Sequence, residues 1–133
     1  MRHIVLASHH RYAEGLADTL AFLGCRKKLN VICAYVDEKP LAPMVDELFG
    51  AFDPQDEVLI LTDILQGSVN QAFAPHMGER VFLVTGATVS LALELCLAGE
   101  PLTAESIARS IELARQSICL VNTLDSSAEE GDE

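Results

Sequence analysis

Residues 2–12 read Arg-His-Ile-Val-Leu-Ala-Ser-His-His-Arg-Tyr, and this stretch decides the fold. The apolar run at residues 4–7 predicts a short buried strand, which a polar cluster at residues 8–11 ends. Apolar residues at helical spacing follow, and they predict an amphipathic helix that reaches about Leu23. A strand that leads into a helix through a tight polar turn is the first half of a β-α-β unit. In open α/β sheets, ligands bind at the edge where such turns lie, so we expect the chemistry of this protein there.

The rest of the chain repeats this alternation of strand and helix. Nearly continuous apolar runs predict further strands at residues 31–36, 58–62 and 81–84. Apolar spacing and capping signals predict further helices over residues 41–52 and starting at Ser68, Thr88 and Thr103. This order predicts a single-domain α/β fold with an open, mainly parallel sheet and helices on both faces.

The carboxyl-terminal part leaves one alternative open. Residues 118–121 could continue the last helix or form a short β-segment, because periodicity does not separate the two in so short an apolar run. We expect residues 1–124 to form the domain. Residues 125–133 are acidic and poor in apolar side chains, which predicts a disordered tail.

The composition disfavours several classes of function. The chain has 133 residues, half of them hydrophobic, and a net charge of −11, which argues against a nucleic-acid or anionic-membrane partner. No apolar run approaches the roughly 20 residues that a membrane-spanning helix needs, and the first residues lack the apolar core of a signal peptide. The four cysteines show no Cys-x-x-Cys spacing. We therefore expect a cytoplasmic protein without a zinc or dithiol motif.

Polar residues follow the predicted strands at one edge of the sheet. His9 follows the first strand, Asp63 the third, and Gly67 and Ser68 begin the next helix. This set suits phosphohistidine chemistry, because a carboxylate can keep the proton on one imidazole nitrogen while the other nitrogen attacks phosphorus. Backbone N–H groups and a serine hydroxyl can hold the phosphoryl oxygens.

Each of these residues also has a purely structural interpretation. Ser8 and Ser68 could simply cap helices, and Asp63 could be an ordinary acid at a strand end. Outside this set, we expect His3 to be structural or exposed and His76 to be solvated. A metal site is disfavoured because adjacent histidines at a helix start rarely point to one centre. No Gly-x-Ser-x-Gly elbow of a hydrolase is present. We expect no metal and no cofactor.

Three segments resemble one known family. Residues 7–16, Ala-Ser-His-His-Arg-Tyr-Ala-Glu-Gly-Leu, resemble the Ala-Ser-His-Gly-x-Phe-Ala-x-Gly-Leu opening of the IIA domains of the mannose/fructose/sorbose class. Those domains belong to the bacterial phosphoenolpyruvate-dependent sugar phosphotransferase system (PTS). Residues 61–69 resemble the family's Asp-x-x-Gly-Gly-Ser-Pro turn, and residues 85–91 its Gly-x-Asn-x-Pro-Met segment. The resemblance covers roughly residues 1–122, with the motifs in the same order and spacing.

The resemblance implies a phosphocarrier. His9 would accept a phosphoryl group from the carrier HPr and pass it to a IIB component, and Asp63 would orient the imidazole. Gly67 and Ser68 would hold the phosphate, and His10 and Arg11 would face the partner. The membrane would be reached only indirectly, through the IIC and IID components. The family is dimeric and exchanges a C-terminal β-segment, for which residues 118–122 are the candidate.

The sequence also departs from the family pattern. His10 stands where the family has glycine, so we expect its side chain to slow the approach of a partner. The other departures are Gln66, Val69, Thr88 and Ser90. They leave two alternatives open: the phosphohistidine subunit of a dihydroxyacetone kinase system, or a non-catalytic regulatory domain of the same fold.

Overall fold

The computed structural model describes residues 1–99 and 101–124, so the predicted acidic tail lies outside the described residues. Four strands form one sheet in the order β2-β1-β3-β4, and all neighbouring strands are parallel. The strands are β1 (Arg2–His9), β2 (Leu29–Ala34), β3 (Glu57–Thr62) and β4 (Val81–Thr85). The predicted open α/β fold with a parallel sheet is confirmed. β1 is longer than its apolar run, because polar residues at both of its ends also pair with neighbouring strands.

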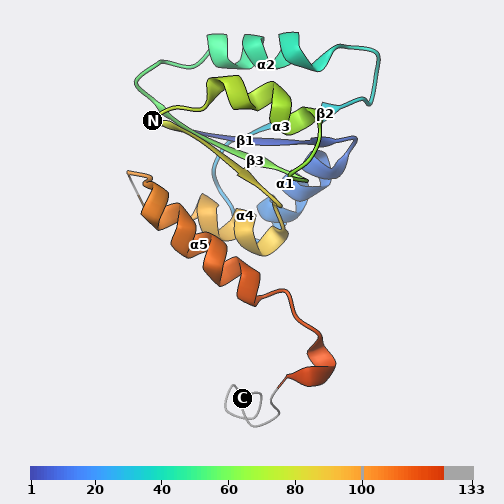
Figure 1. Cartoon of the computed structure of the whole chain (residues 1–133), viewed down its shortest axis with the longest axis vertical. Helices are drawn as coiled ribbons and strands as arrows, with labels where there is room; N and C mark the ends of the chain where they lie inside the picture. Colours follow the sequence, from blue (N-terminus) through green and yellow to red (C-terminus); the bar gives the residue numbers. More distant parts are fainter. Residues whose placement is uncertain (100, 125–133) are drawn as a thin grey trace.

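Helices cover both faces of the sheet (Figure 1). One layer contains α1 (Tyr12–Phe22), α4 (Val89–Cys96) and α5 (Ala104–Gln116), and the other contains α2 (Leu41–Gly50) and α3 (Ser68–Phe73). Successive residues of a strand point to opposite faces, so Ile4 and Leu6 pack in the first core while Val5 and Ala7 pack in the second. Because both faces are covered, the strands read as continuous apolar runs.

Two predicted helix caps are confirmed and one is wrong. Thr88 accepts a hydrogen bond from the backbone N–H of Leu91, and Thr103 forms a capping box with Ser106. Helix α3 begins at Ser68 as expected, but its N-cap is Gly67 and no side chain caps it. The Ser68 hydroxyl instead contacts another side chain, which is described below.

The histidines outside the predicted site are both held by aromatic rings. His3 is structural, as expected: its ring stacks on Phe52 with a centroid separation of 4.0 Å. The prediction that His76 is merely solvated is wrong, because it stacks on Phe49 at 4.1 Å and lies 3.4 Å from Asp46. His76 is the last residue of the 3-10 turn η1 (Ala74–His76), which carries it over α2.

Within the single chain, the segment after α5 neither continues the helix nor forms a β-segment. The last helix ends at Gln116, and Ser117 donates its hydroxyl hydrogen to the carbonyl oxygen of Ala114. Ile118 is 70% exposed, so it does not continue the buried stripe of α5. The chain then forms a 3-10 turn, η2 (Val121–Thr123), and this segment stands away from the body of the molecule (Figure 1).

Candidate functional site

The predicted site residues converge at the carboxyl edge of the sheet. His9 is the last residue of β1, and Asp63 directly follows β3, its neighbour in the sheet. The Nδ1 atom of the His9 imidazole lies 3.0 Å from Oδ2 and 3.2 Å from Oδ1 of the Asp63 carboxylate. Because an ionised carboxylate only accepts hydrogen bonds, Nδ1 carries the hydrogen and donates it. In the neutral ring, the lone pair then lies on Nε2, the nitrogen that faces away from Asp63.

Asp63 is held by several donors at once. Its Oδ2 also accepts the backbone N–H of His9 at 2.8 Å, and its Oδ1 accepts the N–H of Ile64 at 3.0 Å. Partial burial by itself would raise the pKa of Asp63, but the hydrogen bonds from His9 and Ile64 outweigh it and lower the pKa. Asp63 is therefore an anion at neutral pH, and its orientation is fixed by the same bonds.

Gly67 lies directly against the free nitrogen of His9. A Cβ at this position would stand 3.0 Å from Cε1 and 3.1 Å from Nε2 of the imidazole. Its φ angle of 153° is also one that residues with a side chain rarely adopt. Glycine is thus required here for two reasons, and it lets a turn of backbone approach the atom that would react.

A partly buried polar network fixes the turn between Asp63 and Gly67. The Thr62 hydroxyl lies 2.5 Å from Oδ1 of Asn70 and 2.7 Å from the hydroxyl of Thr85. Asn70 donates its amide hydrogen to the carbonyl oxygen of Leu65 at 2.8 Å. Sequence reasoning did not single out Thr62 and Asn70. The feature that could have indicated Thr62 is its hydroxyl at the end of an otherwise apolar strand. In the structure this residue is fully buried.

Ser68 contacts Tyr35, a residue that the sequence analysis placed inside a strand. The two hydroxyl oxygens are hydrogen-bonded to each other. β2 ends at Ala34, and Tyr35 has a positive φ of 68°, so the chain leaves the sheet one residue before the tyrosine. The Tyr35 ring centroid lies 5.9 Å from that of His9. The site therefore has a fourth side chain, Tyr35, that the strand pattern did not predict.

His10 and Arg11 lie at the surface, immediately after His9. His10 has a φ of 57°, so its backbone adopts the left-handed conformation in which glycine is favoured. Its N–H donates to the carbonyl oxygen of Ala34 at 2.8 Å, and its own carbonyl oxygen accepts the Ser8 hydroxyl hydrogen at 3.0 Å. Arg11 is exposed and lies 3.5 Å from Glu14.

Ser8 and Tyr12 support the turn rather than a ligand. Ser8 is fully buried, and its oxygen accepts the N–H of Ala13 in the first turn of α1 at 2.7 Å, although the N-cap position itself is Arg11. Tyr12 donates its hydroxyl hydrogen to the carbonyl oxygen of Ala87 and so joins α1 to the turn after β4. Burial and the nearby Asp63 charge raise the pKa of Tyr12, so it remains a neutral donor.

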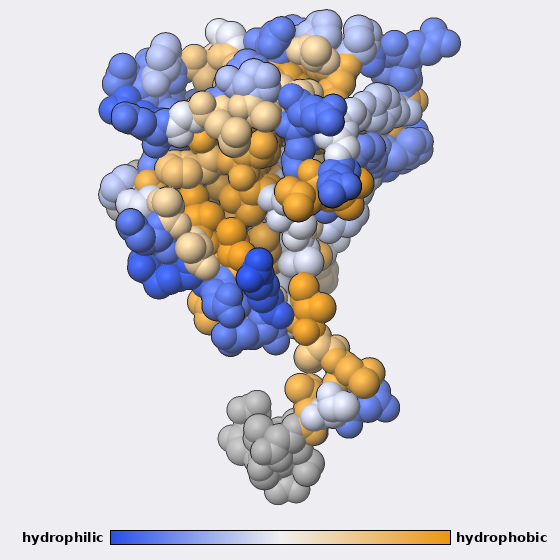
Figure 2. Space-filling model, in the orientation of Figure 1, coloured by the Kyte–Doolittle hydropathy of each residue, from blue (hydrophilic) through white to orange (hydrophobic). Residues whose placement is uncertain are grey.

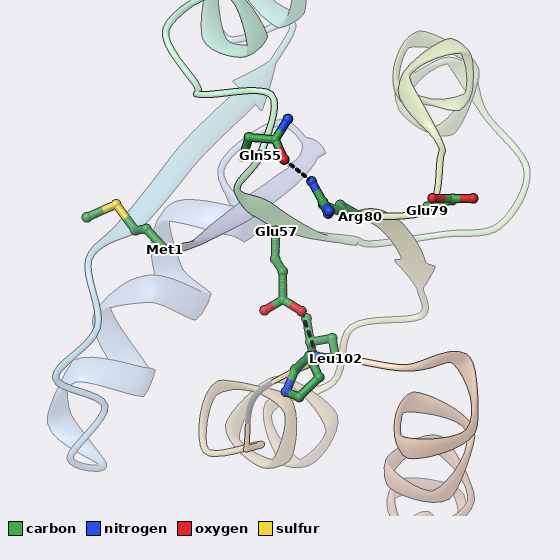
Figure 3. A pocket seen from close by; sticks show the side chains of 7 residues that line it. Met1, Gln55, Glu57, Glu79, Arg80 and Leu102 are labelled. Atoms are coloured by element: carbon green, nitrogen blue, oxygen red, sulfur yellow. Dashed lines mark hydrogen bonds between the residues drawn. The ribbon is translucent and has the colours of Figure 1, made fainter.

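A pocket of 610 Å³ lies at the opposite, amino edge of the sheet (Figure 3). Glu57 accepts the N–H of Leu102 there, and Arg80 donates to Gln55. The pocket thus lies at the start of β3, while Asp63 directly follows the end of that strand. Among residues 1–99 and 101–124, no group of three potential metal ligands is found. In the same part of the chain, no helix is both long and apolar enough to span a membrane.

Comparisons with known proteins show which family and which solved structures this chain is similar to. The family model described as "PTS system fructose IIA component" matches residues 3–112. A solved structure from Klebsiella pneumoniae, described as a phosphoenolpyruvate-dependent sugar phosphotransferase system permease, is 32% identical, with a TM-score of 0.85 and 92% of each chain covered.

Two more distant structures show the same fold. One is a PTS IIA protein associated with the fucose utilization operon of Streptococcus pneumoniae, which is 24% identical with a TM-score of 0.70; the match covers 91% of this chain and 93% of that one. The other is the mannose/sorbose-specific IIA subunit from Enterococcus faecalis, 21% identical with a TM-score of 0.74, covering 93% and 95% of the two chains.

Proposed function

This chain belongs to the family of PTS system fructose IIA components, and we propose that it is a phosphocarrier that acts through His9. In this proposal His9 accepts a phosphoryl group from phospho-HPr and passes it to a IIB component for coupled sugar uptake and phosphorylation. One observation carries the proposal: Asp63 holds the hydrogen on Nδ1 of His9, while the other nitrogen of the ring faces Gly67.

The geometry supports a simple transfer step. The lone pair on Nε2 of His9 attacks phosphorus, the P–N bond to the donor histidine breaks, and its electron pair returns to the donor's imidazole. The His9 ring keeps its hydrogen on Nδ1 and gains positive charge, which the Asp63 carboxylate offsets. Delivery to IIB is the reverse of this step with a different histidine or thiolate acceptor. Such transfers depend mainly on positioning and electrostatics, and Asp63 contributes to both.

Gly67 and Ser68 are the proposed phosphate contacts. Gly67 has no side chain to fill the space next to Nε2, so a phosphoryl group can occupy it. The Ser68 hydroxyl lies at the start of α3, directly after that glycine, and it is exposed. His10 and Arg11 are exposed and directly follow His9 in the chain, and they are the proposed partner-facing residues.

The proposed partners fit the charge of the chain. With a net charge of −11, the protein suits a donor whose docking face is basic, and this attraction would speed encounter. We place the reaction in the cytoplasm, with the membrane reached only through IIC and IID components. No cofactor is needed, because the phosphoryl donor and acceptor are both proteins.

We also propose that the protein is a homodimer that exchanges its C-terminal segment. β4 is an edge strand, and beside it β4 and α5 line a mainly apolar groove of 560 Å³. The apolar side chains of residues 118–124 are between 46% and 70% exposed: Ile118, Leu120, Val121 and Leu124. Figure 2 shows the apolar face of the body and the apolar segment standing clear of it. Residues 118–122 of one chain could therefore add to the β4 edge of a second copy.

The carrier role is tested by incubating the protein with phosphoenolpyruvate, enzyme I and HPr. We expect acid-labile phosphate on the protein and, in peptide mapping, on His9 rather than His10. His9→Gln should abolish the labelling, and His3→Gln should retain it. Phosphate on His10 alone would contradict the assignment. A chain that takes up no phosphate would be a regulatory domain instead.

A second measurement separates the acceptors. The phosphorylated protein is mixed with a IIB component or with a dihydroxyacetone kinase subunit, and we expect transfer to IIB.

The dimer is tested by light scattering on the whole chain and on two truncations. Removal of residues 118–133 should give a monomer, whereas removal of residues 125–133 alone should leave the dimer intact.

A further inference from the structure

Tyr35 reaches across the end of β1 to the far side of the His9 site. It directly follows β2, yet its hydroxyl is hydrogen-bonded to Ser68 at the start of α3. β1 lies between β2 and β3 in the sheet, so the tyrosine side chain passes over the strand that ends in His9. Its ring is tilted by 40° to the His9 imidazole, with a centroid separation of 5.9 Å.

The exposure of Tyr35 distinguishes it from a core aromatic residue. The side chain is 52% exposed and belongs to neither of the two hydrophobic cores. By contrast, Phe73, which is fully buried, packs in the second core. Tyr35 instead makes a hydrogen bond to Ser68 and a tilted aromatic contact with His9, both at the site.

The chemistry of the two hydroxyls favours one direction for the bond between them. A phenol is a better donor than an aliphatic alcohol, because its proton is more acidic. When Tyr35 donates to Oγ of Ser68, the hydrogen of Ser68 is free to point elsewhere. Ser68 directly follows Gly67, which lies against Nε2 of His9, so in the proposed reaction a phosphoryl group on Nε2 offers a strong acceptor for that hydrogen.

We propose that Tyr35 is a positioning residue for phosphoryl transfer at His9. It donates to Ser68 and so orients the serine O–H toward the phosphoryl oxygens, while its ring covers one side of the phosphohistidine against water. This inference rests on the proposed phosphocarrier function and adds a residue that acts through Ser68. The site would then stabilise the bound phosphoryl group through a relay of two hydroxyls, in which each hydrogen bond strengthens the other.

The test uses phosphoramidate, a small donor that phosphorylates histidine without any protein partner. The rate of His9 labelling and the half-life of the phosphohistidine are followed by ³¹P NMR on the whole protein. The variants are Tyr35→Phe, which keeps the ring, Ser68→Ala, and the two combined. Each single change should slow labelling about 10-fold, the size expected for one lost hydrogen bond to a charged group. The double variant should be no slower than the slower single variant.

A matched control and a second tyrosine variant sharpen the result. Tyr12→Phe also removes a tyrosine hydroxyl at this edge, but that hydroxyl donates to a backbone carbonyl. In the double variant of Tyr12→Phe and Ser68→Ala, the fold-reduction in labelling rate should equal the product of the two single fold-reductions. Tyr35→Leu should in addition shorten the half-life of the phosphohistidine, because the covering ring is lost. Thermal unfolding of every variant shows whether the fold is intact.

The outcomes separate this inference from the carrier function. Equal labelling rates in wild type and Tyr35→Phe, or effects of Tyr35→Phe and Ser68→Ala that multiply, would overturn it. A wild-type chain that phosphoramidate does not label on His9 would overturn it as well. If phosphoramidate labels His9 in a Tyr35-dependent way but phospho-HPr does not, the carrier function fails and the positioning role of Tyr35 stands.

Discussion

The two ends of β1 carry the same pair of side chains. Near the amino edge, Nε2 of His3 lies 2.9 Å from Asp56, and at the carboxyl edge Nδ1 of His9 lies 3.0 Å from Asp63. Both aspartates flank β3, one directly before it and one directly after it. The chain thus provides its own comparison between a histidine–aspartate pair in a proposed reaction site and a pair at the other end of the same strands.

The difference lies in what surrounds each ring. His3 is stacked flat on Phe52, and its aspartate also lies 3.2 Å from the amino group of Met1. In His9 the carboxylate contacts Nδ1, whereas in His3 it contacts Nε2. The free nitrogen of His9, Nε2, faces Gly67. The His9 side chain is 33% exposed, against 18% for His3. A carboxylate beside an imidazole is therefore not enough for a nucleophile. In the proposed reaction, the space next to the free nitrogen of His9 distinguishes it from His3.

The strongest test of this comparison removes each carboxylate in turn. Asp63→Asn should slow phosphoryl transfer from phospho-HPr by about 10²–10⁴-fold, because the amide no longer fixes the hydrogen on Nδ1 or offsets the ring charge. Asp56→Asn removes the equivalent carboxylate from His3 and should leave the rate within about twofold of wild type, since it lies outside the site. Transfer rates are measured by rapid quench. An unchanged rate in Asp63→Asn would remove the aspartate from the mechanism.

The next test fills the space beside the free nitrogen. Gly67→Ala places a Cβ 3.0 Å from the His9 ring, so the ring or the turn must move. Displacing a reacting atom by about 1 Å can cost about 10²-fold, and we expect a loss of that order in transfer rate. Gly86→Ala is the matched control, because Gly86 also has a positive φ, 76°, but no atom stands within 4 Å of its added Cβ. Equal losses in both variants would attribute the effect to backbone strain instead.

A smaller effect is expected at His10. Its backbone already adopts the left-handed conformation that suits glycine, so His10→Gly should keep the turn and remove only the exposed imidazole. Transfer from phospho-HPr should become about 3- to 10-fold faster, because steric effects on approach exceed the roughly 1 kcal/mol of a single exposed charge. Labelling by phosphoramidate should not change, since this donor needs no docking surface. Slower transfer from phospho-HPr would make His10 a contributor to phosphate binding.

The smallest effect concerns stability in acid. Hydrogen bonding to His3 and to the amino terminus lowers the pKa of Asp56 below its ordinary 3.8, although partial burial opposes this. The pKa of Asp63 is also lowered. A carboxyl whose pKa is lowered by folding stabilises the protein above its unfolded pKa and loses that contribution as the pH falls through the folded one. Melting temperatures should therefore fall below about pH 4. The fall should be shallower in Asp56→Asn and in Asp63→Asn, and identical slopes in all three proteins would contradict this.

The sheet and the pairing of His9 with Asp63 follow from features that a sequence displays. Continuous apolar runs mark strands covered on both faces, and the polar residues His9 and Asp63 mark where two neighbouring strands end. Parallel strands bring such ends together, so topology alone places the imidazole beside the carboxylate. The positions of Thr88 and Thr103 as caps are likewise local and were predictable.

The parts that sequence reasoning missed depend on long-range contacts or on single backbone angles. Ser68 was expected to cap α3, but Tyr35 contacts its hydroxyl across a sequence separation of 33 residues, and no periodicity reports such a contact. Tyr35 itself continues an apolar pattern, and only its positive φ shows that the strand has ended. The pair of His3 and Asp56 was missed because Asp56 lies in the turn before β3, where an acid is unremarkable.

The single free nitrogen of His9 has a consequence for the order in which the donor and the acceptor protein can bind. Its other nitrogen is occupied by Asp63, so one opening serves for both arrival and departure of the phosphoryl group. In the proposed reaction, the donor and the acceptor must then use the chain alternately and cannot be bound to one site together. An excess of unloaded donor would slow delivery by occupying that opening. The overall rate of such a carrier depends on how fast each partner protein dissociates as well as on how fast it reacts.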